Sequence, residues 1–215
     1  MPQLHYAQIR YLSIVVLAWL TVFTLTRSLL LVSHLADANI SISNLMGLYA
    51  IGMIYDLSFL LYATLPMALY LLLCPRAIWQ QRWHKKFMAS AMALSLFVML
   101  FTAVAEWLFW DEFGVRFNFI AVDYLVYSEE VINNILESYP IYPLLALLAI
   151  LAIGLTFILR RPLAAALDAP RMAPKQALYS LGVLLLLAGL SSAFVGQNSP
   201  RGIGGNAYQR ELASN

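Results

Sequence analysis

Three ionisable residues fall inside long apolar runs of the sequence: Arg27, Asp56 and Glu106. A charge at the centre of a bilayer-spanning helix costs about 2.5 to 3.5 kcal/mol on insertion scales, so such residues mark a functional site or a charge pair. The loop charges, described below, place all three at similar depth near the outer face. Two interpretations stay open. Arg27 forms a structural ion pair with Asp56 or Glu106, or the three residues form a polar cavity that receives a lipid headgroup.

A second group of polar residues lies in the segment 111–140, which carries six acidic residues against a single arginine. Its two adjacent carboxylates, Asp111 and Glu112, have no histidine or further ligand near them in sequence, so a solvated loop is favoured over a metal site. The members that we add to the candidate polar cluster, for a lipid headgroup or for structure, are Asp111, Arg116, Asn118 and Asp123.

No residue pattern predicts catalysis by this chain. The single cysteine, Cys74, cannot form an internal disulfide or a CxxC redox site. The three histidines fall in segments predicted on opposite faces of the membrane, so they do not build a metal cluster. No Ser, Cys or Thr has a recognisable base and orienting partner. We therefore expect no catalytic residue, metal ligand or cofactor site within these residues.

The elements that must position the polar residues are apolar helices. The chain has 215 residues, of which 62% are hydrophobic and only 11% charged, with a mean hydropathy of +0.76. A soluble domain is nearer half apolar and a quarter charged. Five runs are long enough to span a bilayer, and the second is so long that we expect a kink near Pro66 or first turns at the interface. The runs are 11–32, 45–74, 87–110, 141–159 and 177–195.

The distribution of Lys and Arg predicts how these helices are oriented. Cytoplasmic loops carry an excess of basic residues. With the N-terminus inside, the inner segments hold Arg10, Arg76, Arg82, Lys85, Lys86, Arg160, Arg161, Arg171 and Lys175. The outer segments hold only Arg116, Arg201 and Arg210. We therefore predict an all-α membrane protein with the N-terminus in the cytoplasm and the C-terminus outside. The net charge of +2 is too small to suggest nucleic-acid binding.

The second half of the segment 111–140 has helical periodicity. Apolar residues fall on one face and acidic residues on the other, which predicts an amphipathic helix at the outer interface. Because this helix is acidic, we expect it to dock against protein rather than against anionic lipid. The tail 196–215 is rich in turn residues, and a new helix begins near its end with capping-box spacing. It reads as an outer linker after a transmembrane domain of residues 1–195.

Three stretches resemble a known family. They are the outer segment 112–125 (EFGVRFNFIAVDYL) with its continuation 129–140 (EEVINNILESYP), the second-run motif 52–58 (GMIYDLS) and the tail 206–213 (NAYQRELA). Together they resemble the membrane domain of bacterial lipoteichoic acid synthase-like and phosphoglycerol transferase-like proteins of the sulfatase, or alkaline phosphatase, superfamily. The resemblance covers essentially the whole chain, and the loop motif is its specific part.

The resemblance implies about five membrane helices, a linker helix and a large outer catalytic domain, in the bacterial cytoplasmic membrane. That domain would hold a divalent metal, often manganese, and a threonine nucleophile. It would transfer phosphoglycerol from a lipid or hydrolyse a phosphate or sulfate ester. This sequence ends where the domain should begin, so no catalytic or metal residue carries over. The expected role is to anchor that domain and to present a lipid substrate to it, with membrane lipids and the outer domain as partners.

Two other functions remain open. The chain is a stand-alone multi-pass membrane protein that binds lipid or a partner without enzyme activity, or it is a small transporter. The transporter is disfavoured because the sequence has no inverted repeat and no matched pair of interrupted helices around a midplane site. Its intramembrane charges also cluster near one face.

Overall fold

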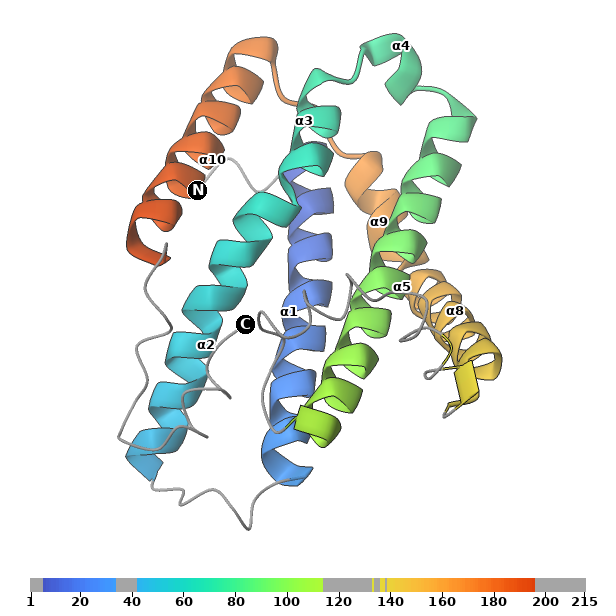
Figure 1. Ribbon diagram of the computed structural model, residues 1–215. Coiled ribbons are helices and arrows are strands. Elements are labelled where there is room, and N and C mark those ends of the chain that lie inside the picture. The colour runs from blue at the N-terminus through green and yellow to red at the C-terminus, as the bar shows by residue number, and fades with distance from the viewer. Residues whose placement is uncertain (1–5, 34–41, 114–132, 134–135, 138, 196–215) are drawn as a thin grey trace.

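The computed structural model describes residues 6–33, 42–113, 133, 136–137 and 139–195. Within these ranges the chain is helical, and no strand is formed there. The helices are α1 (Ala7–Ser33), α2 (Ile42–Ala63), α3 (Leu65–Leu73), α4 (Arg76–Trp79), α5 (Arg82–Phe113), α8 (Ile141–Ile158), α9 (Arg160–Leu167) and α10 (Pro174–Val195). Figure 1 shows the long helices running along a common direction, except for α8, which is inclined to them.

The long helices stand in a row rather than in a closed bundle. Helix α10 packs on α2 and α3, these pack on α1, α1 packs on α5, and α5 packs on α8. Figure 1 shows the same order across the page, with α1 near the centre and α10 and α8 at the two edges. The short helix α9 packs against α1 and α5. The main core accordingly follows α1, where Ala7, Tyr11 and Val15 are buried.

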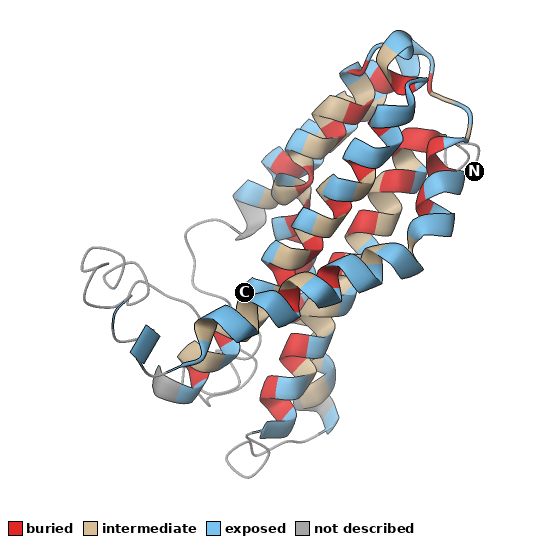
Figure 2. Cartoon of the chain, turned by 90° about the vertical axis from the view of Figure 1, so that its right-hand side faces the viewer, coloured by how far each residue is buried: buried red, intermediate tan, exposed pale blue. Residues whose placement is uncertain are grey.

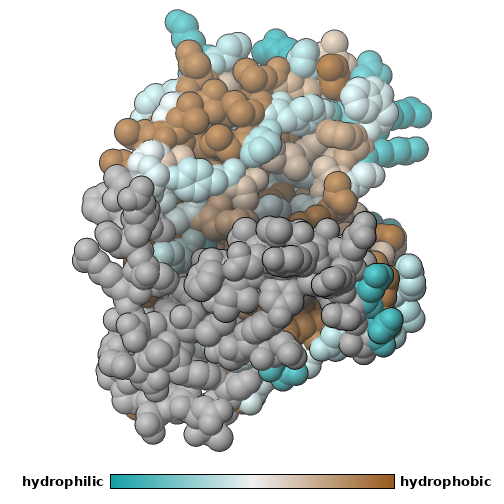
Figure 3. All heavy atoms as spheres, viewed as in Figure 1, coloured by the Kyte–Doolittle hydropathy of each residue, from teal (hydrophilic) through white to brown (hydrophobic). Residues whose placement is uncertain are grey.

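Five helices are long and apolar enough to cross a membrane, as the sequence predicts: Ala7–Ser33, Leu45–Ala63, Arg82–Asp111, Ile141–Ile158 and Pro174–Ser192. A row of helices leaves much apolar surface uncovered. Leu29, Ile150 and Leu186 are each more than 60% exposed, and α8, which faces the viewer in Figure 2, is mostly exposed along its length. Hydrophobic residues gather over the upper part of the face in Figure 3. Such a surface suits a multi-pass membrane protein, because lipid tails can cover it.

Of the two alternatives for the second run, the structure shows a break near Pro66. The run divides into α2 and α3 at Thr64, and Pro66 lies in the first turn of α3. Proline has no backbone N–H, so it cannot continue the hydrogen-bond ladder of the preceding helix. The Thr64 hydroxyl donates to the Leu60 carbonyl at 2.6 Å. Near the bend, the Tyr62 hydroxyl donates to the Ala188 carbonyl of α10 at 2.6 Å, which ties the bent segment to α10.

Two details differ from the sequence prediction. The third span was predicted to end at Trp110, but α5 continues to Phe113, so Asp111 lies in its last turn and not in a loop. The short helices α4 and α9 were not predicted, because they lie in the basic segments that connect the apolar runs. They meet where Trp79 Nε1 donates to the Leu167 carbonyl at 3.2 Å.

The predicted outer amphipathic helix falls almost entirely outside the described residues. Three residues of its second half, Asn133, Leu136 and Glu137, are helical and exposed. The linker 196–215 also lies outside the described residues.

The up-and-down course of the chain gathers basic residues at one end, which we call the basic end. It comprises the starts of α1, α5 and α10, the ends of α3 and α8, and all of α4 and α9. Its only acidic residue among those described is Asp168. Its basic residues are Arg10, Arg76, Arg82, Lys85, Lys86, Arg160, Arg161, Arg171 and Lys175. Asp111 lies at the other ends of these helices, and we call that side of the molecule the opposite end.

Candidate functional site

A buried ion pair joins α1 to α2. Arg27 Nη1 and Nη2 lie 2.9 Å and 3.0 Å from the two carboxylate oxygens of Asp56, so the pair is bidentate. The side chains of Arg27 and Asp56 are only 1% and 0% exposed. Two parallel charge-assisted hydrogen bonds are the strongest arrangement available to these groups. They neutralise two charges that neither lipid nor an apolar core could solvate. This geometry supports the structural ion pair over an open headgroup cavity.

Gly52 makes room for the guanidinium. It lies one helical turn before Asp56 on the same face of α2. A Cβ atom at Gly52 would lie 2.5 Å from both Nε and Nη2 of Arg27. Any other residue would therefore push the arginine away from its partner. The spacing Gly-x-x-x-Asp, which the sequence shows in the segment 52–58, is explained by this contact: glycine opens the slot and aspartate binds the group that fills it.

The ion pair lies one turn inside an apolar cluster at the opposite end. Leu30 and Leu31 of α1, Leu48 of α2 and Trp110 of α5 are buried together in that cluster. Arg27, Gly52 and Glu106 each lie four residues from a member of this cluster, toward the middle of the same helix. The corresponding cluster members are Leu31, Leu48 and Trp110. Four residues make about one turn, or about 6 Å of rise, so these three residues occupy one level. Glu106 is 8% exposed and belongs to the same buried polar layer.

An apolar hollow of about 300 Å³ opens between α1 and α5 near this layer. It is lined by Val22, Leu25, Thr26, Leu29, Leu100, Ala103, Val104 and Trp107. Thr26 and Trp107 are the sequence neighbours of Arg27 and Glu106, so the hollow lies beside the polar layer and not within it. Its only polar side-chain group besides the Trp107 indole, the Thr26 hydroxyl, donates to the Val22 carbonyl at 2.9 Å. The hollow is suited to a hydrocarbon chain.

A second polar region, which the sequence did not reveal, lies at the basic end. Here a hollow of about 500 Å³ is lined by Arg76, Trp79, Gln80, Lys85, Leu167, Asp168, Ala169 and Arg171. The Arg171 guanidinium stacks on the Trp79 ring, 4.5 Å from its centroid, and donates to the Cys74 carbonyl. Lys85 pairs with Asp168 at an exposed position. Counting the loop charges identified these basic residues in the sequence. They form one group, however, only because α4, α5 and α9 meet.

Arg171 is held in a constrained position in this hollow. Its Nε has no hydrogen-bond partner among the described residues. Burial lowers the pKa of Arg171, and the charge of Arg76 lowers it further, against an opposing effect of Cys74. Arginine nevertheless stays charged in proteins. An anion beside Arg76 and Arg171 would therefore relieve an electrostatic cost that is already present in the fold.

Cys74 and His84 lie close together beneath the same region. Cys74 Sγ is 4.0 Å from His84 Nε2, and His84 packs between the rings of Tyr70 and Trp79. Both residues are buried, with His84 0% exposed. A thiol beside an imidazole can act as a nucleophile when substrate reaches it. This pair is enclosed by aromatic rings, so its arrangement is that of packed core residues.

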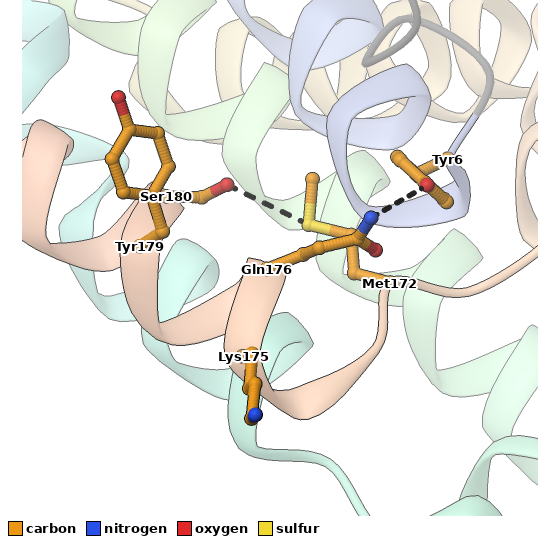
Figure 4. Close-up of a pocket in the computed structure, with 6 residues that line it drawn as sticks. All are labelled: Tyr6, Met172, Lys175, Gln176, Tyr179 and Ser180. Atoms are coloured by element: carbon orange, nitrogen blue, oxygen red, sulfur yellow. Dashed lines mark hydrogen bonds between the residues drawn. The ribbon is translucent and has the colours of Figure 1, made fainter.

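The hollow drawn in Figure 4, of about 200 Å³, lies where the start of α10 meets the residue before α1. Gln176 Nε2 donates to the Tyr6 hydroxyl at 3.0 Å, and the Ser180 hydroxyl lies 3.7 Å from Met172 Sδ. Lys175 points away from these contacts in Figure 4. The contacts attach α10 to the beginning of the chain, and they bring together no group suited to catalysis.

The remaining predicted residues fall into two sets. Asp111 is exposed in the last turn of α5, away from the enclosed ion pair. Arg116, Asn118 and Asp123 lie outside the described residues. Within the part of the chain that the structure describes, no three His, Cys, Asp or Glu residues are grouped so that they could hold a metal ion.

Comparison of the chain with protein-family models, with curated proteins and with solved structures finds no match.

Proposed function

We propose that this chain is the membrane domain of a lipoteichoic acid synthase-like enzyme of the sulfatase superfamily. It anchors an outer catalytic domain and offers that domain a lipid substrate. The single observation that carries the proposal furthest is the bidentate Arg27–Asp56 pair seated in the Gly52 slot. It gives a physical role to the sequence motif of residues 52–58, which is one of the three stretches that carry the family resemblance.

The ion pair supports an anchoring role because of where it lies. It fixes α1 to α2 at the opposite end, where the acidic segment 111–140 begins in the last turn of α5. An outer domain resting on that segment would need the helix ends beneath it to keep one arrangement. A charge pair enclosed from solvent and held by two hydrogen bonds constrains the two helices more than apolar contacts alone would do.

Presentation of a lipid is supported by the apolar hollow between α1 and α5. A lipid with one acyl chain in this hollow would hold its headgroup near the opposite end, beside the level of Arg27 and Glu106. There an outer active site could reach the headgroup phosphate. The catalytic threonine and the manganese ion that such a reaction needs would belong to the outer domain.

The orientation in this proposal follows from the basic end. Basic residues are retained on the cytoplasmic side of bacterial membranes, and nine of them gather at this end against Asp168 alone among the described residues. We therefore place the basic end in the cytoplasm of a bacterial inner membrane, with the opposite end outside.

The decisive experiment is to measure the size of the native protein in its own membranes with an antibody against the N-terminal segment. A band far above 24.1 kDa would support an attached outer domain. A band at 24.1 kDa would overturn the enzyme proposal and leave a membrane protein that acts alone.

A second experiment addresses docking of the outer domain on the acidic segment. In the long form of the protein, replacing Ile132 and Leu136 by Asp should loosen the docking and increase protease cleavage of the linker, without blocking membrane insertion. Replacing the polar residues Asn133 and Glu137 by Ser serves as the matched control. Equal protease sensitivity of all three proteins would show that the segment does not carry the domain.

The stand-alone lipid-binding protein remains the second candidate function. The same hollow between α1 and α5 favours it, because a site for a hydrocarbon chain needs no enzyme beside it. Phosphoglycerol transfer to an acceptor by the purified full-length protein would decide for the enzyme. Lipid binding without such transfer and without hydrolysis of a phosphate or sulfate ester would decide for the second candidate.

A further inference from the structure

Two hollows at the basic end share a wall. The polar hollow between α4, α5 and α9, described above, contains Lys85 and Leu167 in its lining. A second hollow of about 420 Å³ is lined by the same two residues and runs down between α5, α8 and α9. The two hollows are therefore adjacent, with Lys85 and Leu167 between them, and one elongated ligand could place a polar group in the first and an apolar chain in the second. We call the first hollow the upper part and the second the lower part.

The lower part is a groove between helices. Small side chains on one face of α5 leave it open: Ala89 and Ser90, which lie four and three residues before Ala93, and Ala93 itself. The opposite wall is formed by Ile153, Thr156, Phe157, Arg160, Leu163 and Ala164 of α8 and α9. The Thr156 hydroxyl donates to the Ala152 carbonyl at 2.8 Å, so it does not call for a polar ligand. The groove is suited to an acyl chain at the level of the bilayer.

The upper part has an excess of positive charge. Arg76, Lys85 and Arg171 face one carboxylate, that of Asp168, which is already paired with Lys85. The Arg171 guanidinium is fixed by the Trp79 ring and the Cys74 carbonyl, so it is arranged before any ligand arrives. Tryptophan is also the residue that is favoured at the headgroup level of a bilayer. One phosphate group beside Arg76 and Arg171 would balance part of the excess charge.

We propose that the basic end binds one anionic glycerophospholipid, with its phosphate beside Arg76, Lys85 and Arg171 and an acyl chain in the groove between α5, α8 and α9. Basic pockets among membrane helices are a known means of holding anionic headgroups. A free phosphate would satisfy the upper part but would leave the groove unused. The lipid site lies at the basic end, whereas the Arg27–Asp56 layer lies near the opposite end. The lipid site therefore does not depend on the proposed function.

The test is native mass spectrometry of the full protein, released from detergent micelles that contain equal amounts of phosphatidylglycerol and phosphatidylethanolamine. The wild type should retain one phosphatidylglycerol in preference to phosphatidylethanolamine. The double variant R76Q/K85Q should retain less phosphatidylglycerol than the wild type, by a factor of about five or more, since each basic residue adds to the attraction of an anionic lipid. The variant A93F, which fills the groove, should also lose the lipid, and A93L replaces it if the larger ring prevents folding.

Matched controls separate a built site from general attraction. R82Q/K86Q removes the same charge from exposed neighbours that line neither hollow, and L94F adds a ring to a position that is 64% exposed. Both controls should retain the lipid as the wild type does. Equal loss in both double variants would reduce the effect to diffuse charge and overturn the site. Retention of phosphatidylethanolamine at the same level, unchanged retention in the variants at position 93, or displacement of the lipid by inorganic phosphate would overturn it as well.

Discussion

The two ends of this protein use charge in opposite ways. In the Arg27–Asp56 pair, a guanidinium binds a carboxylate, both side chains are at most 1% exposed, and Gly52 leaves the space that the guanidinium fills. At the basic end, three cations meet one carboxylate, and the Lys85 and Asp168 side chains are 48% and 61% exposed. The first group is paired within the protein, whereas the second has unbalanced positive charge that can attract an anion.

The difference teaches what each region can do. A balanced pair without solvent access holds helices together, because separating it would leave a charge where nothing can solvate it. An open and unbalanced group adds little to the stability of the fold, since water screens it, but it attracts an anion. A charged residue inside a span is therefore not by itself evidence of a binding site. Charged residues in the loops can attract a ligand as well as indicate orientation.

The largest expected effect comes from breaking the enclosed pair. Replacing Asp56 by Leu removes the bidentate partner of the buried Arg27, and we expect a loss of about 3 to 5 kcal/mol in unfolding free energy. The measurement is equilibrium unfolding in mixed micelles. The double variant R27M/D56L should recover most of that loss, because it removes both charges. A double variant as unstable as D56L would show that the pair is not the source of the stability.

The second effect sharpens the role of Gly52. The change Gly52→Ala places a methyl group against the Arg27 guanidinium, and we expect a loss of about 1 to 3 kcal/mol from overpacking. Gly154 and Gly182 are matched controls, since nothing lies within 4 Å of a Cβ atom at either position. Alanine there should be neutral or slightly stabilising, because glycine disfavours a helix. The same unfolding measurement compares the three variants, and equal effects would refute the slot.

A smaller effect is expected just inside the basic end, near the starts of α1 and α5. The Tyr11 hydroxyl is buried and donates to the Met88 carbonyl at 2.8 Å. Replacing Tyr11 by Phe keeps the ring and removes the donor, so we expect a loss of about 1 kcal/mol in the same unfolding measurement. A value near that of D56L would indicate that this contact, and not the ion pair, fixes the row of helices.

The smallest effect on stability should come from the basic end. Lys85→Gln removes an exposed ion pair, and such pairs contribute between about 0 and 1 kcal/mol. Thermal unfolding of the delipidated protein should therefore hardly change. In micelles with phosphatidylglycerol, the wild type should gain more stability than K85Q, because a ligand stabilises only the state that binds it. A large loss without lipid would give Lys85 a structural role and weaken the contrast between the two ends.

Much of the architecture could be predicted from the sequence. The five spans and the kink near Pro66 follow from apolar run length and from the missing backbone N–H of proline, which are local properties. The similar depth of Arg27, Asp56 and Glu106 followed from counting residues along those runs. The end of α5 was misplaced because Asp111 and Glu112 look like the start of a loop, although a helix can continue past its apolar part into water.

The sequence by itself determined that the protein is a set of membrane-spanning helices with its basic residues toward one end, because bilayer thickness and the cost of charge act on each segment separately. Only the tertiary structure decided which charges meet. Sequence spacing left both Asp56 and Glu106 as partners for Arg27, and the packing of α2 on α1 with the Gly52 slot brings Asp56 into a bidentate pair with it. The hollows at the basic end likewise exist only because α4, α8 and α9 come to lie beside α5, through contacts between residues far apart in the chain.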